Sequence, residues 1–437
     1  MRNIALTLAV AGLLSAGVAV WLDADREQPQ LQWARASFGP SSYAAAVERA
    51  DEAVANGTAR LAAAPGEWLP QEVLALGLIE RFRLTGSEAD LAEAGRLLRA
   101  GLAAAPDPAG PSLSAAQIAL MLHDLGTADA ALARYDRTAV KLPDEQAAAW
   151  ALSGDIAFQR GRIDEAEHLY GKAHAALPGF GSAARLANVA LWRGQPDRAV
   201  ALASKQLQEV RVTPQDRARA ALLLADFSYA AGRLDEAGEW IARAEDAFSG
   251  FWLVEAYAAQ QLAAEGKTDA AIAALEKLAR RTSEPEVIDT LAGLLRHSGR
   301  TEDADRWTLV AARLWDKKLA DARDAYRLHA AEHHLDFGDP AMALALAREE
   351  VAKRPFGEAI EVLASAYLAN DRPAEALAWL EQAERQGYRA VSLDMARGEV
   401  LEALGRDGDA RRYYRRATTL NPDAAGDLRK LLRFGHY

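Results

Sequence analysis

Two histidines and a glutamate form the pattern in this sequence that is most suggestive of chemistry. His329, Glu332 and His333 spell H-x-x-E-H, in which two imidazoles can bind zinc while a carboxylate activates water. Residues four apart lie on one face of a helix, so the two histidines could share a metal ion. The sequence offers no evident third ligand, and Ala331 occupies a packing position. We interpret the string as a chance match, with a metal-dependent hydrolase as the alternative.

Other signatures of enzymatic chemistry are missing from the sequence. It contains no Gly-rich phosphate loop, no G-x-G-x-x-G and no G-x-S-x-G. Cysteine is absent, which excludes disulfides, thiolate metal sites and cysteine nucleophiles. The 437 residues carry 51 basic and 62 acidic side chains, a net charge of −11, which disfavours a general nucleic-acid-binding surface. We therefore expect a protein that is not an enzyme, needs no cofactor and binds no nucleic acid.

A self-similar pattern of small residues recurs through most of the chain. Subtracting residue numbers along a series of glycines gives separations of 33 to 40, clustering near 34. The series is Gly86, Gly126, Gly161, Gly194, Gly232, Gly266, Gly299, Gly338, Asp371 (in place of glycine) and Gly405. Alanine follows most of them by five residues, as Ala131, Ala166, Ala199, Ala237, Ala271, Ala304, Ala343, Ala376 and Ala410. The pattern predicts a helical hairpin in each period, turning at the glycine.

Each residue type has a physical role in such a hairpin. Glycine ends the first helix because it adopts the left-handed backbone of the turn freely. Alanine lets the second helix approach the first closely. Proline closes several units, such as Pro178 and Pro422, because it cannot continue a helix interior. Asp164 and Asp235, three residues after their glycines, are expected to cap the second helix.

The spacing of these residues is typical of a known repeat. The unit closing at Pro178 carries Trp150, Gly154, Gly161, Ala166, Tyr170 and Ala173 at consensus positions of the tetratricopeptide repeat (TPR). The sequence resembles the TPR family from about Gln71 to Pro422, and more narrowly uncharacterised bacterial exported or membrane-anchored TPR scaffold proteins. The resemblance implies an all-α, right-handed superhelical solenoid of about ten helical hairpins.

The N-terminal residues read as a targeting segment. Residues 4–22 are apolar and uncharged, and at about 1.5 Å per residue they approach the thickness of a bilayer core. They are either a signal peptide cleaved near Ala19 or an uncleaved anchor in the inner membrane, and both place the remaining chain in the periplasm. We assign 1–22 to this segment, 23–40 to a tether, 41–70 to a capping helix region, 71–423 to the TPR array and 424–437 to a C-terminal capping helix or tail.

The first helices of TPR hairpins line the concave face, so its residues can be counted back from each turn. Six residues before the turns stand Glu80, Leu120, Asp155, Asn188, Asp226, Gln260, Gly293, Glu332, Ser365 and Glu399. In the middle of this row, aromatic residues accompany the acidic ones. We predict a partner-binding surface made of Asp155, Phe158, Asn188, Trp192, Asp226 and Tyr229. Aromatic rings flanked by carboxylates suit a peptide with basic and apolar residues.

Together these observations predict a non-catalytic protein–protein interaction scaffold of the bacterial cell envelope. It would bind a partner peptide or protein along the concave face. Besides the hydrolase, the alternative function is a glycan-binding array in envelope polysaccharide machinery, which would use the same exposed aromatic residues.

Overall fold

The structure of the chain, a computed structural model, describes residues 38–207, 212–424 and 434. These residues form twenty helices, and apart from one isolated bridge between Ser42 and Ser249 they contain no β-structure. The first helix, α1 (Tyr43–Ala63), is capped by Ser42, whose hydroxyl accepts a hydrogen bond from the backbone amide of Ala45. The predicted apolar segment 4–22 and nearly all of the predicted tether lie outside the described residues.

The other helices pair into antiparallel hairpins. The first five are α2 (Trp68–Thr85) with α3 (Glu88–Ala104), α4 (Ser112–Met121) with α5 (Leu125–Asp136), α6 (Pro143–Gln159) with α7 (Ile163–Ala176), α8 (Phe180–Trp192) with α9 (Pro196–Leu207), and α10 (Pro214–Ala230) with α11 (Leu234–Ala247). They continue as α12 (Trp252–Ala264) with α13 (Thr268–Thr282), α14 (Pro285–His297) with the first part of α15 (Thr301–Asp336), the second part of α15 with α16 (Pro340–Lys353), α17 (Gly357–Ala369) with α18 (Pro373–Arg385), and α19 (Val391–Ala403) with α20 (Asp407–Leu420).

Helix α15 serves two hairpins because it is broken at Ala322. The backbone of Ala322 has φ −150° and ψ 68°, which no helix contains. The part before the kink is the second helix of the seventh hairpin, and the part after it is the first helix of the eighth. Counting the two parts separately, the described residues contain ten hairpins, and they form the all-α TPR solenoid that the sequence predicts. The array begins at Trp68, three residues before the boundary drawn from the sequence.

The repeated alanines bring the two helices of each hairpin together. Ala166, Ala199, Ala237, Ala271 and Ala304 are all 0 % exposed, and their counterparts in the other hairpins are at most 3 % exposed. A larger side chain would separate the helices at these points. This burial fits the prediction that alanine permits close approach.

The turns follow the predicted glycine pattern with two exceptions. Seven of the turn glycines, and Asp371, have φ between +56° and +78°, the left-handed region. In the second hairpin His123 takes that conformation with φ +57°, and Gly126 lies inside α5 instead. Gly338 does not have a positive φ, and the residue before it, Phe337, caps α15 with φ −134°.

The predicted aspartate caps are wrong by two residues. The residues that flank the start of α7 and α11 are Arg162 and Arg233, and neither makes a side-chain cap. Asp164 and Asp235 lie in the first turn of each helix. There a negative charge stabilises the helix through its dipole rather than through a hydrogen bond to a free amide.

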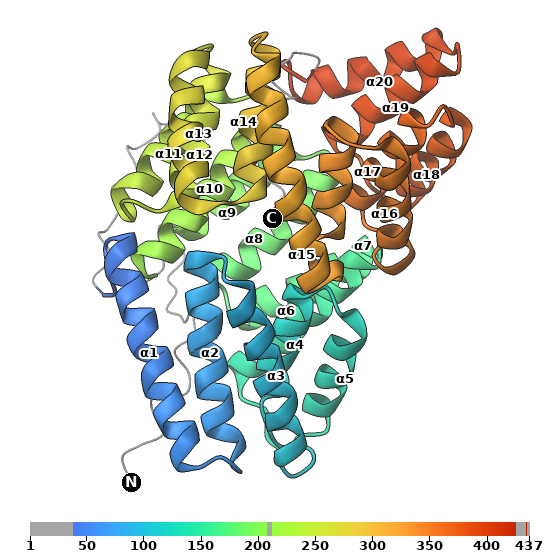
Figure 1. Cartoon of the computed structure of the whole chain (residues 1–437). Coiled ribbons are helices and arrows are strands. Elements are labelled where there is room, and N and C mark those ends of the chain that lie inside the picture. The colour runs from blue at the N-terminus through green and yellow to red at the C-terminus, as the bar shows by residue number, and fades with distance from the viewer. Residues whose placement is uncertain (1–37, 208–211, 425–433, 435–437) are drawn as a thin grey trace, which may run out of the picture.

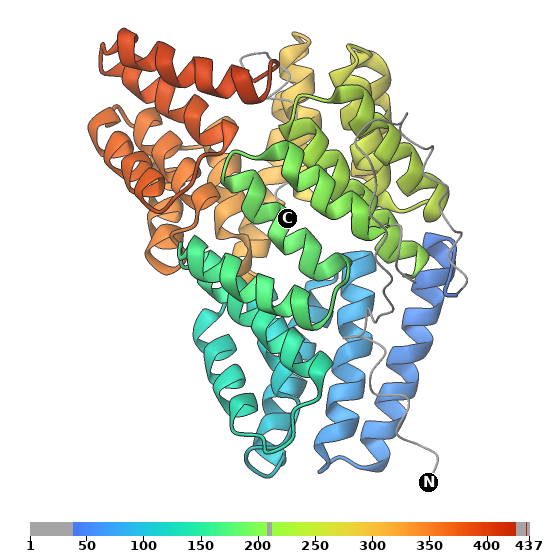
Figure 2. The ribbon, with the colours of Figure 1, turned by 180° about the vertical axis from the view of Figure 1, so that it is seen from behind.

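The solenoid is wound so tightly that its later hairpins pack on its earlier ones. Figures 1 and 2 show the first hairpins, α2 to α7, on one side of the molecule and the later hairpins stacked against them. The Nδ1 atom of His123 in the second hairpin lies 3.0 Å from the carbonyl oxygen of Asp324 in the eighth hairpin. The backbone amide of Arg389, before the tenth hairpin, donates to the carbonyl of Trp192 in the fourth at 2.7 Å. The second and fourth hairpins thus meet the chain about six hairpins later.

None of the helices in the described part of the chain combines the length and the apolar composition that a bilayer-spanning segment requires.

Candidate functional site

Asp155, the first acidic residue of the predicted partner-binding surface, is paired within the molecule. Arg185 of α8 donates to both of its carboxylate oxygens, at 2.7 and 2.8 Å, and the Tyr170 hydroxyl of α7 donates at 2.9 Å. Burial would lower the pKa of Arg185, but Asp155 outweighs that effect and raises it. This carboxylate joins the third hairpin to the fourth, and its charge is already compensated.

Asp226 and Tyr229 of α10 also have partners in the next hairpin. The hydroxyl of Tyr257 on α12 donates to Asp226 at 2.9 Å, and the hydroxyl of Tyr229 donates to the amide oxygen of Gln261 at 2.7 Å. Tyr229 is only 7 % exposed, and burial raises the pKa of its hydroxyl. Both side chains therefore stabilise hairpin stacking.

The aromatic residues Phe158 and Trp192 pack against the next turn of the superhelix. Phe158 is 8 % exposed, and its ring centroid lies 6.3 Å from those of both Phe356 and Tyr388. Trp192 meets Tyr388 edge-on at 5.5 Å. This aromatic cluster closes the seam between the third and fourth hairpins and the ninth and tenth, so the rings are turned toward the protein's own chain.

Asn188 differs from the other five predicted residues. It is half-buried on α8, and within the described residues its side-chain amide makes no hydrogen bond. The structure thus brings all six residues onto neighbouring first helices, but five of them are engaged in packing, hydrogen bonds or ion pairs. Their role in partner binding stays a prediction, and Asn188 is the member best placed to make a new hydrogen bond.

The H-x-x-E-H histidines have separate structural roles. His333, 1 % exposed, places its Nδ1 2.8 Å from Asp289, which also accepts a hydrogen bond from the indole of Trp315 at 2.8 Å. The Nδ1 atom of His329 lies 3.1 Å from a carboxylate oxygen of Glu332. Burial lowers the pKa of His329, but the carboxylates of Glu286 and Glu332 outweigh this and raise it to about 9. A protonated imidazole has no lone pair for a metal ion.

Across the described residues, no group of three or more His, Cys, Asp or Glu side chains is placed to hold a metal. The geometry agrees with reading the string as part of a packed helix. The partner residues, Asp289 and Trp315, come from α14 and the first part of α15, and no motif in the sequence connects them to the histidines.

Gln260 on α12 is a site residue whose role the sequence did not reveal. Its side-chain amide oxygen accepts from the backbone N–H of Phe434 at 3.0 Å, and its NH2 group donates to the carbonyl of Phe434 at 3.4 Å. The count back from the turns placed Gln260 on the inner face, but the residue that it contacts is 174 positions later. A repeat pattern carries no information on such a contact.

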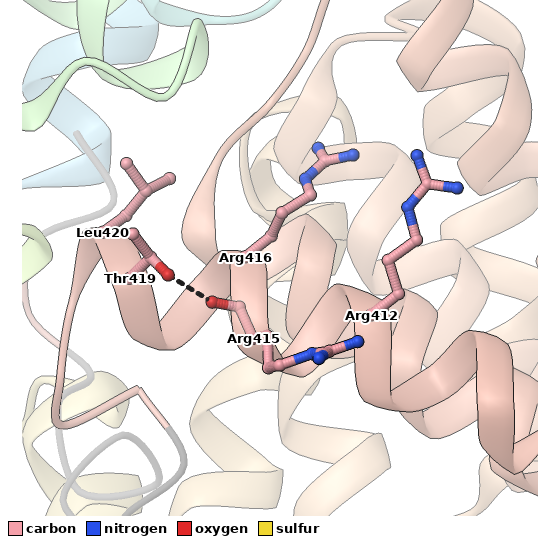
Figure 3. A pocket seen from close by; sticks show the side chains of 5 residues that line it. All are labelled: Arg412, Arg415, Arg416, Thr419 and Leu420. Carbon is pink, nitrogen blue, oxygen red and sulfur yellow. Dashed lines mark hydrogen bonds between the residues drawn. The ribbon is translucent and has the colours of Figure 1, made fainter.

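A shallow, open hollow on α20 is lined by Arg412, Arg415, Arg416, Thr419 and Leu420 (Figure 3). Arg416 forms ion pairs with Asp394 at 2.9 Å and with Glu384 at 3.3 Å. Burial raises the pKa of Asp394 to about 6, although Arg416 opposes the shift. The other two arginines are exposed, as expected on the solvent face of an amphipathic helix, and they suggest no specific ligand.

Comparison with solved structures finds matches to a tetratricopeptide repeat protein and to IFIT1. The chain shares 17 % identity with a tetratricopeptide repeat protein from Parabacteroides merdae, covering 58 % of this chain and 98 % of that one, with a TM-score of 0.35. It shares 14 % identity with a human IFIT1 dimer with PPP-AAAA, covering 80 % and 90 %, with a TM-score of 0.40. A monomeric IFIT1 mutant with Gppp-AAAA gives the same identity and coverage and a TM-score of 0.41. No curated protein matches the chain.

The family model for the tetratricopeptide repeat matches residues 122–180, 185–250, 328–387 and 361–425, which together make up just over half of the chain. These ranges contain six of the ten hairpins wholly or nearly so, and α5 of the second hairpin. The sequence pattern, the ten stacked hairpins and this match agree: the chain belongs to the tetratricopeptide repeat family.

Proposed function

We propose that the chain is a non-catalytic protein-interaction scaffold of the bacterial cell envelope. The observation that carries the proposal is the TPR array itself, which extends from Trp68 to Leu420. Stacked hairpins provide long helical surfaces for protein partners. The side chains that suggested catalysis, His329 and His333, are engaged by neighbouring carboxylates and serve packing.

The partner in this proposal is a peptide or protein with basic and apolar residues, contacted at Asn188. The net charge of −11 favours association with a basic partner through long-range attraction. Asp155, Phe158, Trp192, Asp226 and Tyr229 would shape and stiffen the surface around Asn188 instead of binding the partner through their own polar groups.

Photo-crosslinking in living cells tests the scaffold proposal. A photoreactive amino acid replaces Asn188 in one strain and Asn56, an exposed residue on α1, in a control strain. We expect a discrete crosslinked protein from position 188 that is missing from position 56. Identical crosslinks at both positions, or none at 188, would contradict the proposal.

The envelope location is part of the same proposal and is supported by the apolar, uncharged residues 4–22. Either the segment anchors the chain in the inner membrane, or it is cleaved and the chain is released into the periplasm. Protease added to spheroplasts should digest the protein while a cytoplasmic marker survives. Protection of both proteins until the cells are lysed would overturn the location, and the mass of the mature N-terminus distinguishes anchor from signal peptide.

A further inference from the structure

One residue beyond the last hairpin is bound inside the superhelix. Phe434 is 3 % exposed and belongs to the main hydrophobic core. Its backbone N–H and its carbonyl are both paired with the side-chain amide of Gln260, at 3.0 and 3.4 Å. A glutamine amide offers one acceptor and two donors, so it can satisfy both backbone polar groups of one residue.

Tyr257 holds the ring of the same residue. It lies one helical turn before Gln260 on α12 and is 1 % exposed. Its ring centroid is 5.8 Å from that of Phe434, with the planes inclined by 37°. The Tyr257 hydroxyl is fixed by its hydrogen bond to Asp226. Backbone recognition by Gln260 and ring recognition by Tyr257 therefore come from one rigid helix face.

The first residue after α20 contacts the fifth hairpin, which is next to the hairpin that binds Phe434. After α20 ends at Leu420, the side-chain amide of Asn421 donates to the carbonyl of Tyr229 on α10 at 3.0 Å. Ala424 is buried, and Phe434 then contacts α12. The earlier hairpins are covered in the same way by Phe356 and Tyr388, but those residues lie between helices of the array.

We propose that Gln260 and Tyr257 form a peptide-binding subsite for a segment that carries a phenylalanine, and that Phe434 is its intramolecular occupant. A partner's segment of the same chemistry then binds by exchanging with Phe434. This inference rests on the proposed scaffold function and names the chemistry of the partner at one site. A covalently joined segment competes at an effective concentration on the order of millimolar, so it weakens the binding of a free peptide.

Fluorescence anisotropy of the detergent-solubilised full chain tests the exchange. The probe is a labelled peptide with the sequence of residues 428–437, and the control probe has alanine in place of phenylalanine. We expect Phe434→Ala to bind the first probe at least about tenfold more tightly than the wild type does, because the variant leaves the subsite open. Neither protein should bind the control probe at that affinity.

Two second-site variants separate the subsite from general folding effects. Gln260→Ala in the Phe434→Ala background should abolish the gain in affinity for the first probe. Gln261→Ala is the matched control, because its side chain bonds to Tyr229 and Glu265 and has no hydrogen bond to Phe434. It should retain the gain. Circular dichroism reports whether each variant is folded.

The wild-type chain gives a second readout that needs no substitution. Excess unlabelled probe peptide should increase trypsin cleavage after Arg433, whereas the alanine peptide should not. Three results would each overturn the subsite and leave Phe434 a packing residue. They are equal probe binding by Phe434→Ala and wild type, a gain in probe affinity that remains after Gln260→Ala, and trypsin cleavage that the peptide does not change. The scaffold proposal fails separately, when position 188 yields no specific crosslink although the probe still binds.

Discussion

At the scale of single residues, the polar side chains that suggested catalytic chemistry connect helices to one another. Asp289 accepts hydrogen bonds from Trp315 and is paired with His333, and the three residues come from three different helical segments. All three are at most 2 % exposed. Buried polar groups are costly unless they are paired, so each of these contacts is required once the residues are inside. His333, the last residue of the H-x-x-E-H string, therefore has a packing role.

Removing the imidazole of His333 should destabilise the protein without any metal being involved. His333→Ala leaves Asp289 short of one partner and opens a cavity, which should cost about 2–3 kcal/mol of unfolding free energy. His334→Ala, on the partly exposed neighbouring side chain, should cost less than about 1 kcal/mol. Urea unfolding measures both. Equal losses, or a loss in wild type on adding a chelator, would contradict this role.

Glu284 is a residue whose ionisation should set part of the pH dependence of stability. Its carboxylate lies 3.5 Å from the ammonium nitrogen of Lys318, and the same nitrogen lies 2.9 Å from the carboxylate of Glu88. Burial raises the pKa of Glu284 to about 7, although Lys318 opposes the shift. A carboxyl with a raised pKa in the folded state contributes stability below its unfolded pKa of 4.5, and this contribution is lost as the pH rises to about 7.

Glu284→Gln should therefore be more stable than the wild type at pH 8 and similar to it at pH 4. Thermal unfolding across this range measures the difference, with Glu239→Gln on an exposed side chain as the control. A difference between Glu284→Gln and wild type that stays constant from pH 4 to pH 8 would show that Glu284 does not titrate in this window.

At the scale of elements, small residues at fixed places determine how the helices of a hairpin meet. Ala237 is 0 % exposed at the crossing of α10 and α11, and an alanine stands at the same place in eight other hairpins. The sequence predicts these hairpins well because glycine, alanine and proline act within a single unit. It fails where a unit deviates locally, as at His123 in place of Gly126, or in α15, where two helices are merged across a kink.

Enlarging the crossing alanine should destabilise one hairpin and its two neighbours. Ala237→Leu inserts three carbon atoms where none fit, and overpacking of this kind typically costs about 1–3 kcal/mol. Ala242→Leu, on the exposed side of the same helix, should stay within about 0.5 kcal/mol of wild type. Urea unfolding followed by circular dichroism compares them. A change at Ala242 as large as that at Ala237 would argue against close helix approach as the reason for the alanine.

At the scale of the whole molecule, the central feature is that the superhelix packs on itself after about six hairpins. The pitch of a solenoid is the accumulated result of small rotations between neighbouring units, and no residue pattern within a unit specifies it. For that reason the sequence placed Phe158 and Trp192 on an inner face but could not predict that Tyr388 covers both. The same packing buries Phe434 against Gln260, 174 residues away in the chain.

Zero-length carbodiimide crosslinking of the wild-type chain tests this self-packing most directly. The ammonium group of Lys318 lies 2.9 Å from Glu88, which is 230 residues earlier in the chain, while Lys353 lies 2.6 Å from Asp324 in the same hairpin. Mass spectrometry of the crosslinked monomer should identify isopeptide bonds between Lys318 and Glu88 and between Lys353 and Asp324, and urea should abolish the first. Formation of the Lys353–Asp324 bond without the Lys318–Glu88 bond would show an open solenoid and contradict the account.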